Sequence, residues 1–167
     1  MSKTKILFVC LGNICRSACA EAVMKQVVDG RGLAADFEID SAGLISYHTG
    51  EKADPRMRQH AANRGINITS IARKITTSDF SHFDYIIGMD DDNIRRLLDI
   101  APDEQSRLKI SKMSDYCRTY RTNSVPDPYY GGPKDFELVL DLLDDACNGL
   151  VESLRYKFYS FYLPTIQ

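Results

Sequence analysis

Short apolar runs alternate with helical patterns along this chain, and this alternation restricts the fold more than any other feature. Residues 6–9 have the unbroken apolar character of a strand buried on both faces, and residues 83–89 are predicted to form another buried strand. Residues 37–44 and 107–113 give two further strands. Strands separated by helices predict a parallel sheet covered on both sides. We therefore predict a single α/β domain with a four-stranded parallel sheet and helices on both faces.

Helices are predicted from the spacing of apolar side chains and from capping residues. An apolar stripe follows residues 17–30, and a longer one follows residues 136–154. Residues 54–65 begin with Asp54 as a cap, followed by proline, and end in glycine. Residues 90–100 begin with three acids, which favour the positive end of a helix.

Length and composition limit the classes of function. A chain of 167 residues with 26% charged side chains is typical of one globular domain. Its net charge of −2 gives no support for a nucleic-acid or membrane surface, and no stretch has the length of a transmembrane helix. The N-terminal apolar run is too short for a signal peptide, so we expect a cytoplasmic protein. We assign residues 1–157 to the domain and residues 158–167 to an aromatic C-terminal tail. We expect this tail to pack back on the domain, and the alternative is that it forms a small contact surface.

The cysteines do not form a disulfide framework or a metal cluster in this interpretation. Their number is odd, no C-x-x-C pair occurs, and no histidine lies near the N-terminal group. We therefore predict no metal and no cofactor. The five are Cys10, Cys15, Cys19, Cys117 and Cys147.

The stretch "CLGNICRS" follows the first predicted strand and leads into the first predicted helix. Such a loop presents backbone N–H groups and the positive end of a helix to an anion. Gly12 and Asn13 tolerate a left-handed backbone, and Arg16 can return a bidentate guanidinium to the same anion. Cys10 would then point its sulfur into an anion cradle that favours the thiolate. Ser17 can donate its hydroxyl to that thiolate or cap the helix.

This arrangement predicts phosphoryl chemistry. A thiolate that faces a phosphorus held by N–H groups and an arginine is placed for in-line displacement. The product would be a phospho-cysteine, which water must release. The loop lacks the G-x-x-x-x-G-K-[ST] pattern, so it is not a nucleotide-binding P-loop.

A second informative stretch is "SVPDPYYGGPKDF". Asp127 lies between two prolines, which keep the backbone extended and out of a helix. A carboxyl group on such a rigid loop can protonate the leaving oxygen. Tyr129 and Tyr130 follow it and could form the walls of a slot for an aromatic group.

Together, "FVCLGNICRSACAEAV" and "DPYYGGPKDFE" resemble the low-molecular-weight protein tyrosine phosphatases. The likeness continues through "DSAGL", "DPRM", "RGINI", "ARKIT" and "FDYI" and covers the chain to about residue 155. The resemblance implies dephosphorylation of phosphotyrosine-containing proteins without metal or cofactor. We expect a monomer with weak self-association.

The resemblance also implies roles for individual residues. Cys10 is the nucleophile, Arg16 the phosphate clamp, and Asp127 the general acid and then the base. Asn13 and Ser41 brace the loop by hydrogen bonds, and Ser17 supports the thiolate. The phosphate-binding residues are Leu11, Gly12, Asn13, Ile14, Cys15, Arg16 and Ser17; those of the substrate cleft are Tyr47, Tyr129 and Tyr130.

Four positions concern thiols or depart from the pattern. Cys15 matches a loop cysteine that can pair with the nucleophile under oxidation. Ala18 stands where proline is frequent, and Ser70 occupies the position of a histidine that often supports the loop. Cys19 is an additional thiol near the loop.

Three other functions can be compared with the same residues. An arsenate reductase on this scaffold would need two relay cysteines, but none occurs between Cys19 and Cys117. A magnesium-dependent phosphatase would use Asp90 in "MDDDN", where helix capping is the simpler interpretation. A non-catalytic phosphotyrosine-binding module would need neither a nucleophile nor an acid.

Overall fold

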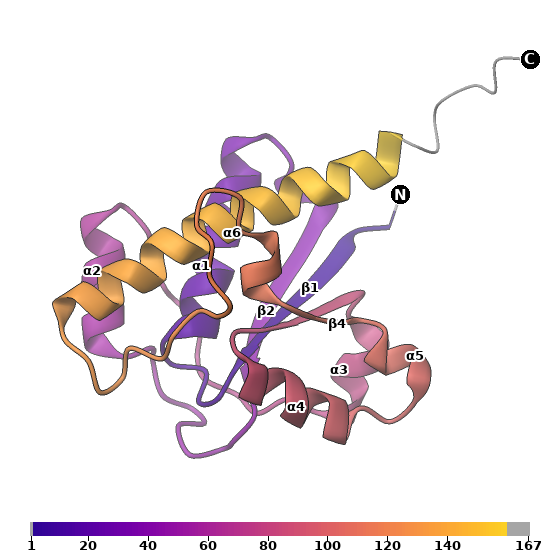
Figure 1. Ribbon diagram of the computed structural model, residues 1–167, viewed down its shortest axis with the longest axis horizontal. Coiled ribbons are helices and arrows are strands. Elements are labelled where there is room, and N and C mark those ends of the chain that lie inside the picture. Colours follow the sequence, from indigo (N-terminus) through magenta and orange to yellow (C-terminus); the bar gives the residue numbers. More distant parts are fainter. Residues whose placement is uncertain (1, 160–167) are drawn as a thin grey trace, which may run out of the picture.

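Four parallel strands form the centre of the molecule (Figure 1). The computed structural model describes the chain from residue 2 to residue 159. Every pairing in the sheet is parallel, in the order β2-β1-β3-β4, and the carboxyl end of β1 pairs with that of β2 through Cys10 and Gly43. The strands are β1 (Thr4–Cys10), β2 (Phe37–Gly43), β3 (Tyr85–Gly88) and β4 (Ile110–Lys112).

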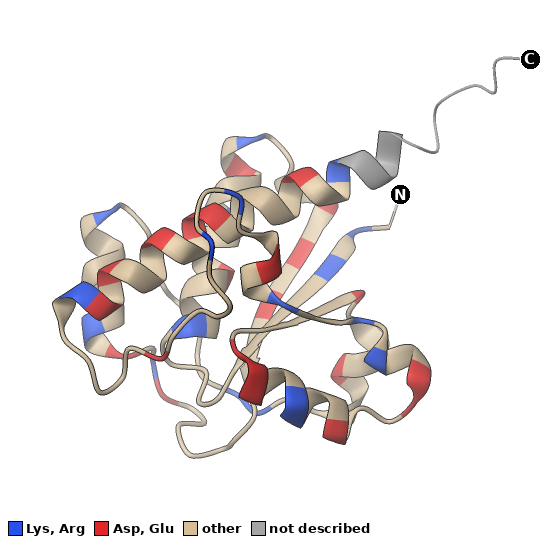
Figure 2. Ribbon diagram, viewed as in Figure 1, with Lys and Arg blue, Asp and Glu red and all other residues tan. Residues whose placement is uncertain are grey.

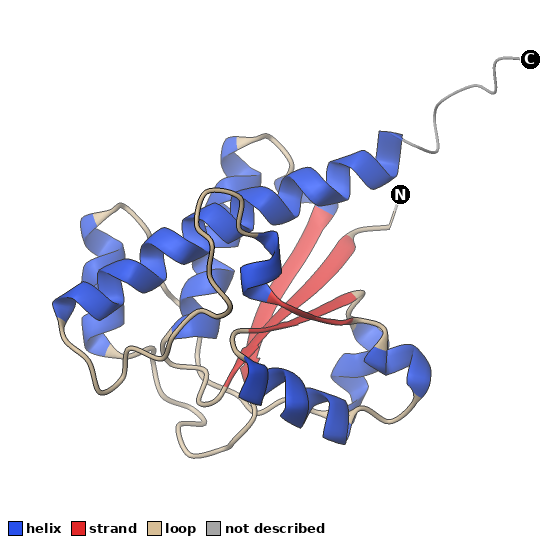
Figure 3. Cartoon of the chain, in the orientation of Figure 1, coloured by secondary structure: helices blue, strands red, loops and turns tan. Residues whose placement is uncertain are grey.

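Helices cover both faces of the sheet, as predicted (Figure 3). One layer contains α1 (Arg16–Gly30), α2 (Pro55–Asn63) and α6 (Pro133–Tyr159). The other contains α3 (Thr77–His82) and α4 (Asp91–Ile100), with α5 (Glu104–Arg107) beside them. Two 3-10 turns complete the described elements, η1 (Ala34–Asp36) and η2 (Met113–Tyr116).

The central strand β1 explains why its sequence is apolar without a break. Ile6 and Phe8 pack into the core formed with α1, α2 and α6, whereas Leu7 and Val9 pack toward α3 and α4. All four side chains are fully buried, since successive residues of a strand face opposite sides of the sheet.

The predicted elements are present with shifted ends. The first helix begins at Arg16 rather than at residue 17, and the cap of α2 is confirmed because Asp54 accepts the N–H groups of Arg56 and Met57. The prediction missed α3 and α5. Of the predicted aromatic tail, residues 160–167 lie outside the described part of the chain.

Charged residues are dispersed over the ribbon in Figure 2, where acidic and basic positions alternate along α4. Within residues 2–159, no helix combines the length and the apolar character needed to cross a membrane.

Candidate active site

The loop between β1 and α1 lines a cavity of about 290 Å³ at the carboxyl end of the sheet. This position follows from the topology, because ligands of open parallel sheets bind outside the carboxyl ends of the strands. The cavity brings together the three residues expected to perform chemistry, although Asp127 lies more than 100 positions from Cys10 and Arg16 in the sequence. Its lining residues are Cys10, Leu11, Gly12, Ile14, Cys15, Arg16, Ile45, Tyr47, His48, Asp127, Tyr129 and Tyr130.

The sulfur of Cys10 is buried at the start of this loop, 3.0 Å from the hydroxyl oxygen of Ser17. Ser17 lies inside the first turn of α1, whose N-cap is Cys15. Of the two alternatives for Ser17, the structure therefore shows the contact with the thiol and not the helix cap.

Asn13 holds the bend of the loop. Its φ of 60° is the one positive φ of a non-glycine residue between residues 2 and 159, a conformation that costs roughly 1–2 kcal/mol. Three hydrogen bonds maintain it: the side-chain N–H groups donate to the hydroxyls of Ser17 (2.7 Å) and Ser41 (3.0 Å), and the side-chain oxygen accepts the backbone N–H of Arg73 (3.1 Å). Gly12 does not adopt a positive φ.

Arg16 is buried and fixed by groups from two distant segments. Its Nη1 donates to Asp90 Oδ2 at 2.6 Å and to the carbonyl of Val125 at 3.1 Å. Burial alone would lower the pKa of Arg16, but Cys10, Asp90 and Asp127 outweigh it and raise that pKa above its ordinary value. The guanidinium is therefore held in one place with its full charge.

Asp90 is a site residue that the sequence assigned to helix capping alone. Its Oδ1 does cap α4, accepting the N–H of Asn93 at 2.7 Å, while Oδ2 binds Arg16. The position of Asp90 just before a predicted helix indicated the capping contact with Asn93. No local pattern indicates the contact with Arg16, because 74 positions separate the two residues.

Asp127 faces the same guanidinium from the opposite loop. Its Oδ2 lies 3.5 Å from Arg16 Nη2, and its Oδ1 accepts the N–H of Tyr129 at 3.1 Å. The backbone N–H of Val125 donates to the carbonyl of Met89 just after β3, which anchors the proline-flanked segment at the sheet end. The carboxylate remains 44% exposed, so it can reach both solvent and a ligand.

Aromatic rings form the rim of the cavity. Tyr129 and Tyr130 meet edge to face with ring centres 4.9 Å apart, and Tyr47 meets His48 in the same way at 4.8 Å. Tyr47 and Tyr130 are 81% and 95% exposed. His48, which the sequence analysis did not single out, also lines the cavity, and its ring lies over Gly12.

All five cysteines are free thiols. Burial, followed by the nearby carboxylate of Asp54, raises the pKa of Cys15 far above the ordinary thiol range. Burial also raises the pKa of Cys19 to about 12 and that of Cys147 well above its usual value. The thiols of Cys15, Cys19 and Cys147 therefore remain protonated at neutral pH.

The outer support of the loop differs from the one implied by the resemblance. Ser70, at the histidine position, has a buried hydroxyl with no hydrogen-bond partner. The oxygen of Asn13 is instead bound by the backbone of Arg73. Among residues 2–159, no group of three His, Cys, Asp or Glu side chains is arranged to hold a metal ion.

Comparison with known proteins extends the resemblance to whole chains. A model of the family described as low molecular weight phosphotyrosine protein phosphatase matches residues 5–159. The low molecular weight phosphotyrosine protein phosphatase of Schizosaccharomyces pombe is 43% identical over 148 residues, covering 87% of this chain and 94% of its own.

Solved structures agree with this match. A crystal structure of a protein tyrosine phosphatase from Entamoeba histolytica superimposes with a TM-score of 0.91 at 52% identity, covering 93% of this chain and 99% of that one. A Drosophila arginine phosphatase also superimposes, with a TM-score of 0.85 at 32% identity, covering 90% and 98%. Fold, loop and whole-chain similarity lead to one conclusion: the chain belongs to the low molecular weight phosphotyrosine protein phosphatase family.

Proposed function

We propose that this chain hydrolyses phosphotyrosine in proteins, and small aryl phosphates, through a phospho-cysteine intermediate. The observation that supports this most is the shared cavity, in which the sulfur of Cys10 and the carboxylate of Asp127 lie with the guanidinium of Arg16. A nucleophile, a cationic clamp and an acid are the three groups that phosphate-ester cleavage requires.

In the first step the thiolate of Cys10 attacks phosphorus. The S–P bond forms as the P–O bond to the tyrosine breaks, and Asp127 gives its proton to the departing phenolate oxygen. The phosphate oxygens accept hydrogen bonds from the backbone N–H groups of residues 11–17 and from the free N–H groups of Arg16. A bound phosphate thereby replaces Asp127 as the partner of Arg16 Nη2.

In the second step water attacks the phospho-cysteine. Asp127 accepts a proton from the water, the O–P bond forms, and the S–P bond breaks to release inorganic phosphate and the thiolate. Ser17, 3.0 Å from the sulfur, can donate a hydrogen bond to the thiolate both before attack and on departure.

The aromatic rim favours an aryl substrate. Ile14 adds an apolar wall to the cavity, and the rings of Tyr47, Tyr129 and Tyr130 can pack against a phenyl ring. A phosphoserine would leave these surfaces without contact, because its side chain is shorter.

Two alternatives on the same scaffold have less support. An arsenate reductase would need further thiols at the cavity, but Cys15 is the other thiol that lines it, and Cys19 and Cys147 are fully buried elsewhere. A non-catalytic phosphotyrosine-binding protein would not need Asp127 beside the phosphate clamp. A phosphoarginine substrate is included in the test because one structural relative is an arginine phosphatase.

Cys15 is proposed to protect the nucleophile. If peroxide oxidises Cys10 to a sulfenic acid, the thiol of Cys15 can displace water and form a disulfide, which a thiol reductant reopens. A cytoplasmic location, a monomeric state with weak self-association, and a domain that ends near residue 157 belong to the same proposal.

The decisive experiment is hydrolysis of p-nitrophenyl phosphate in the presence of chelator, with Cys10→Ser as the matched variant. We expect the parent to turn over and Cys10→Ser to be inactive while still binding orthophosphate. Peptides bearing phosphotyrosine, phosphoserine or phosphoarginine then define the substrate, with phosphotyrosine preferred. Comparable turnover by Cys10→Ser would refute the covalent route, and binding without turnover in the parent would favour the binding module.

A further inference from the structure

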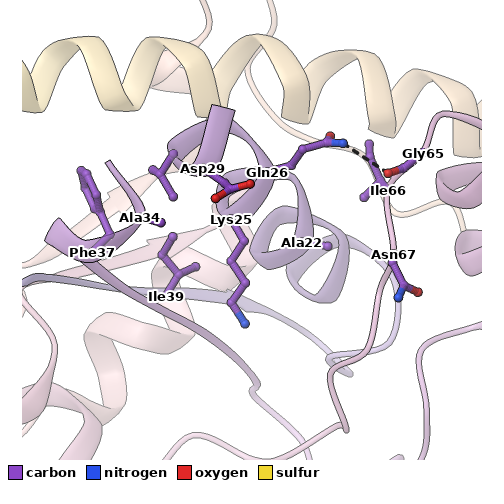
Figure 4. Close-up of a pocket in the computed structure, with 11 residues that line it drawn as sticks. Ala22, Lys25, Gln26, Asp29, Ala34, Phe37, Ile39, Gly65, Ile66 and Asn67 are labelled. Carbon is purple, nitrogen blue, oxygen red and sulfur yellow. Dashed lines mark hydrogen bonds between the residues drawn. The ribbon is translucent and has the colours of Figure 1, made fainter. Parts of the chain in front are cut away.

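A buried carboxylate outside the cavity has no part in the chemistry described so far. Glu21 of α1 is 6% exposed. Its Oε2 lies 2.6 Å from Nζ of Lys25, one helical turn further along. Lys25 borders a groove of about 540 Å³ between α1, the start of β2 and residues 65–67 (Figure 4). The Lys25 side chain is about half exposed, so the buried member of the pair is the carboxylate. Burying a charged group is expensive unless it is paired and hydrogen-bonded.

The other oxygen of Glu21 connects it to the phosphate-binding loop. Oε1 accepts the hydroxyl proton of Ser41 at 2.7 Å. Since a carboxylate can only accept, the single proton of Ser41 is committed to Glu21. The oxygen of Ser41 is then available as an acceptor for Asn13, which donates to it at 3.0 Å.

The hydrogen bonds continue through Asn13, which donates to Ser41 on one side and to Ser17 on the other. The backbone N–H of Arg73 fixes the amide of Asn13 so that its nitrogen faces the two hydroxyls. Ser17 accepts from Asn13 at 2.7 Å, and its own proton faces two acceptors, the sulfur of Cys10 at 3.0 Å and the carbonyl of Ala42 at 3.4 Å. The nearer sulfur is the favoured acceptor when it carries a charge. Four contacts of 3.0 Å or less therefore join Glu21 to Cys10.

We propose that Glu21, with Lys25 as its counter-ion, is a positioning residue that holds Asn13 and the phosphate-binding loop in their bent conformation through Ser41. The proposal deepens the proposed phosphatase function and rests on it. It gives Lys25, which borders a groove separate from the cavity, an effect on phosphate binding. It also gives the buried carboxylate of Glu21 a role that an apolar side chain could not perform.

The substitution Glu21→Gln tests this role at almost constant volume. The ammonium of Lys25 attracts the oxygen of the introduced amide, which turns the amide N–H₂ toward Ser41. Two donors then meet, and the proton of Ser41 loses its acceptor. Removing the charge of Lys25 as well lets the amide turn round and accept from Ser41 again, so the second substitution should restore what the first one removed.

The experiment compares the parent with Glu21→Gln, Lys25→Met and the double variant. Arg96→Gln is the control, because Arg96 is also the exposed basic member of an i,i+4 pair, with Asp92 on α4. For each protein we would measure kcat and KM with p-nitrophenyl phosphate, the Kd for orthophosphate by calorimetry, and the melting temperature. We expect Glu21→Gln to lose about tenfold in kcat/KM and in phosphate affinity, the size of one charge-assisted hydrogen bond. In the double variant kcat/KM and phosphate affinity should recover to within about threefold of the parent. Arg96→Gln should have the same kcat/KM and phosphate affinity as the parent.

Three results would overturn the proposal. One is a folded Glu21→Gln protein with parental kcat/KM and phosphate affinity. Another is a double variant no better than Glu21→Gln, since a purely structural pair would not be rescued. If Glu21→Gln does not fold, Ser41→Ala breaks the next contact, and parental phosphate affinity in that variant would also refute the positioning role. Because orthophosphate binding needs no turnover, these results stand even if the parent proves inactive, an outcome that would refute the proposed function alone.

Discussion

The carboxylate of Asp90 holds two parts of the site together. One oxygen caps α4 and the other binds the guanidinium of Arg16, so the start of a helix in one layer holds the proposed phosphate clamp of the other. Asn at an N-cap accepts the same backbone N–H about as well as Asp does. An amide in place of the carboxylate therefore separates the two contacts.

We expect Asp90→Asn to keep the fold and weaken the clamp. The phosphate Kd should rise by about tenfold, because Arg16 loses a charged partner and gains freedom to move. The melting temperature should fall by no more than a few degrees. Asp103→Asn is the matched control, since Asp103 caps α5 away from the cavity by accepting the N–H of Ser106. An unchanged phosphate Kd in Asp90→Asn would show that Val125 alone suffices to hold Arg16.

Asp127 needs a different test, because its proposed role is to protonate the leaving oxygen. Asp127→Asn should slow phenyl phosphate, a poor leaving group, by about 10²–10⁴-fold and p-nitrophenyl phosphate far less. The p-nitrophenolate needs little protonation, so the ratio of the two rates isolates the proton transfer. Equal losses for both esters would exclude the general-acid role and assign Asp127 to binding.

Among the elements, periodicity predicted those that bury a continuous apolar face. β1 and α6 have such faces, and both were predicted close to their observed positions. α3 was missed because its six residues contribute essentially one core side chain, Phe80. Its capping box between Thr76 and Asp79 was the signal available in the sequence.

The loop was predicted for a related reason. Its members from Cys10 to Ser17 are contiguous, so one strand-loop-helix pattern places them all. The groups that hold the loop from outside come from β2, α4 and residues 73 and 125, and only the folded chain brings these together. Ser41 was found through the family resemblance, whereas Asp90, Arg73 and Glu21 were not assigned to the site.

The end of β2 sets how closely the loop can approach the sheet. A methyl group on Gly43 would lie 3.0 Å from the carbonyl oxygen of Leu11 and 3.1 Å from the carbonyl carbon of Gly12, both backbone atoms. Gly43→Ala should therefore push the loop outward, lowering stability by about 1–3 kcal/mol and kcat/KM by about tenfold. Gly30→Ala at the end of α1, where nothing lies within 4 Å, should leave kcat/KM at the parental value. Parental kinetics in Gly43→Ala would mean that the loop tolerates displacement.

For the whole molecule, one core serves both the fold and the thiol chemistry. The core between the sheet, α1 and α6 contains Cys15, Cys19 and Cys147 as well as Cys10, the proposed nucleophile. Cys147 contacts the carbonyl of Ala20 through its sulfur and is fully buried. Burial thus keeps Cys15, Cys19 and Cys147 protonated, whereas Cys10 lines the cavity as the proposed nucleophile.

The buried thiol of Cys147 makes stability depend on pH in the alkaline range. Burial raises the pKa of Cys147 well above its ordinary value, whereas a thiol in the unfolded chain has a pKa of about 8.5. Below that pH both states hold the proton and the contribution to stability is constant. Above it only the unfolded state loses the proton, so the free energy of unfolding falls as pH rises, by at most about 1.4 kcal/mol per pH unit for each such thiol.

Cys147→Ala should therefore flatten the pH dependence while lowering stability overall. Urea unfolding under reducing conditions between pH 7.5 and about 9.5 should give a slope about 1 kcal/mol per pH unit shallower than in the parent at the alkaline end. Val23→Ala creates a cavity in the same core without removing a thiol, so it should lower the free energy of unfolding equally at every pH. If Cys147→Ala instead ran parallel to the parent, the thiol would ionise alike in both states, and burial in this core would not be what keeps it neutral.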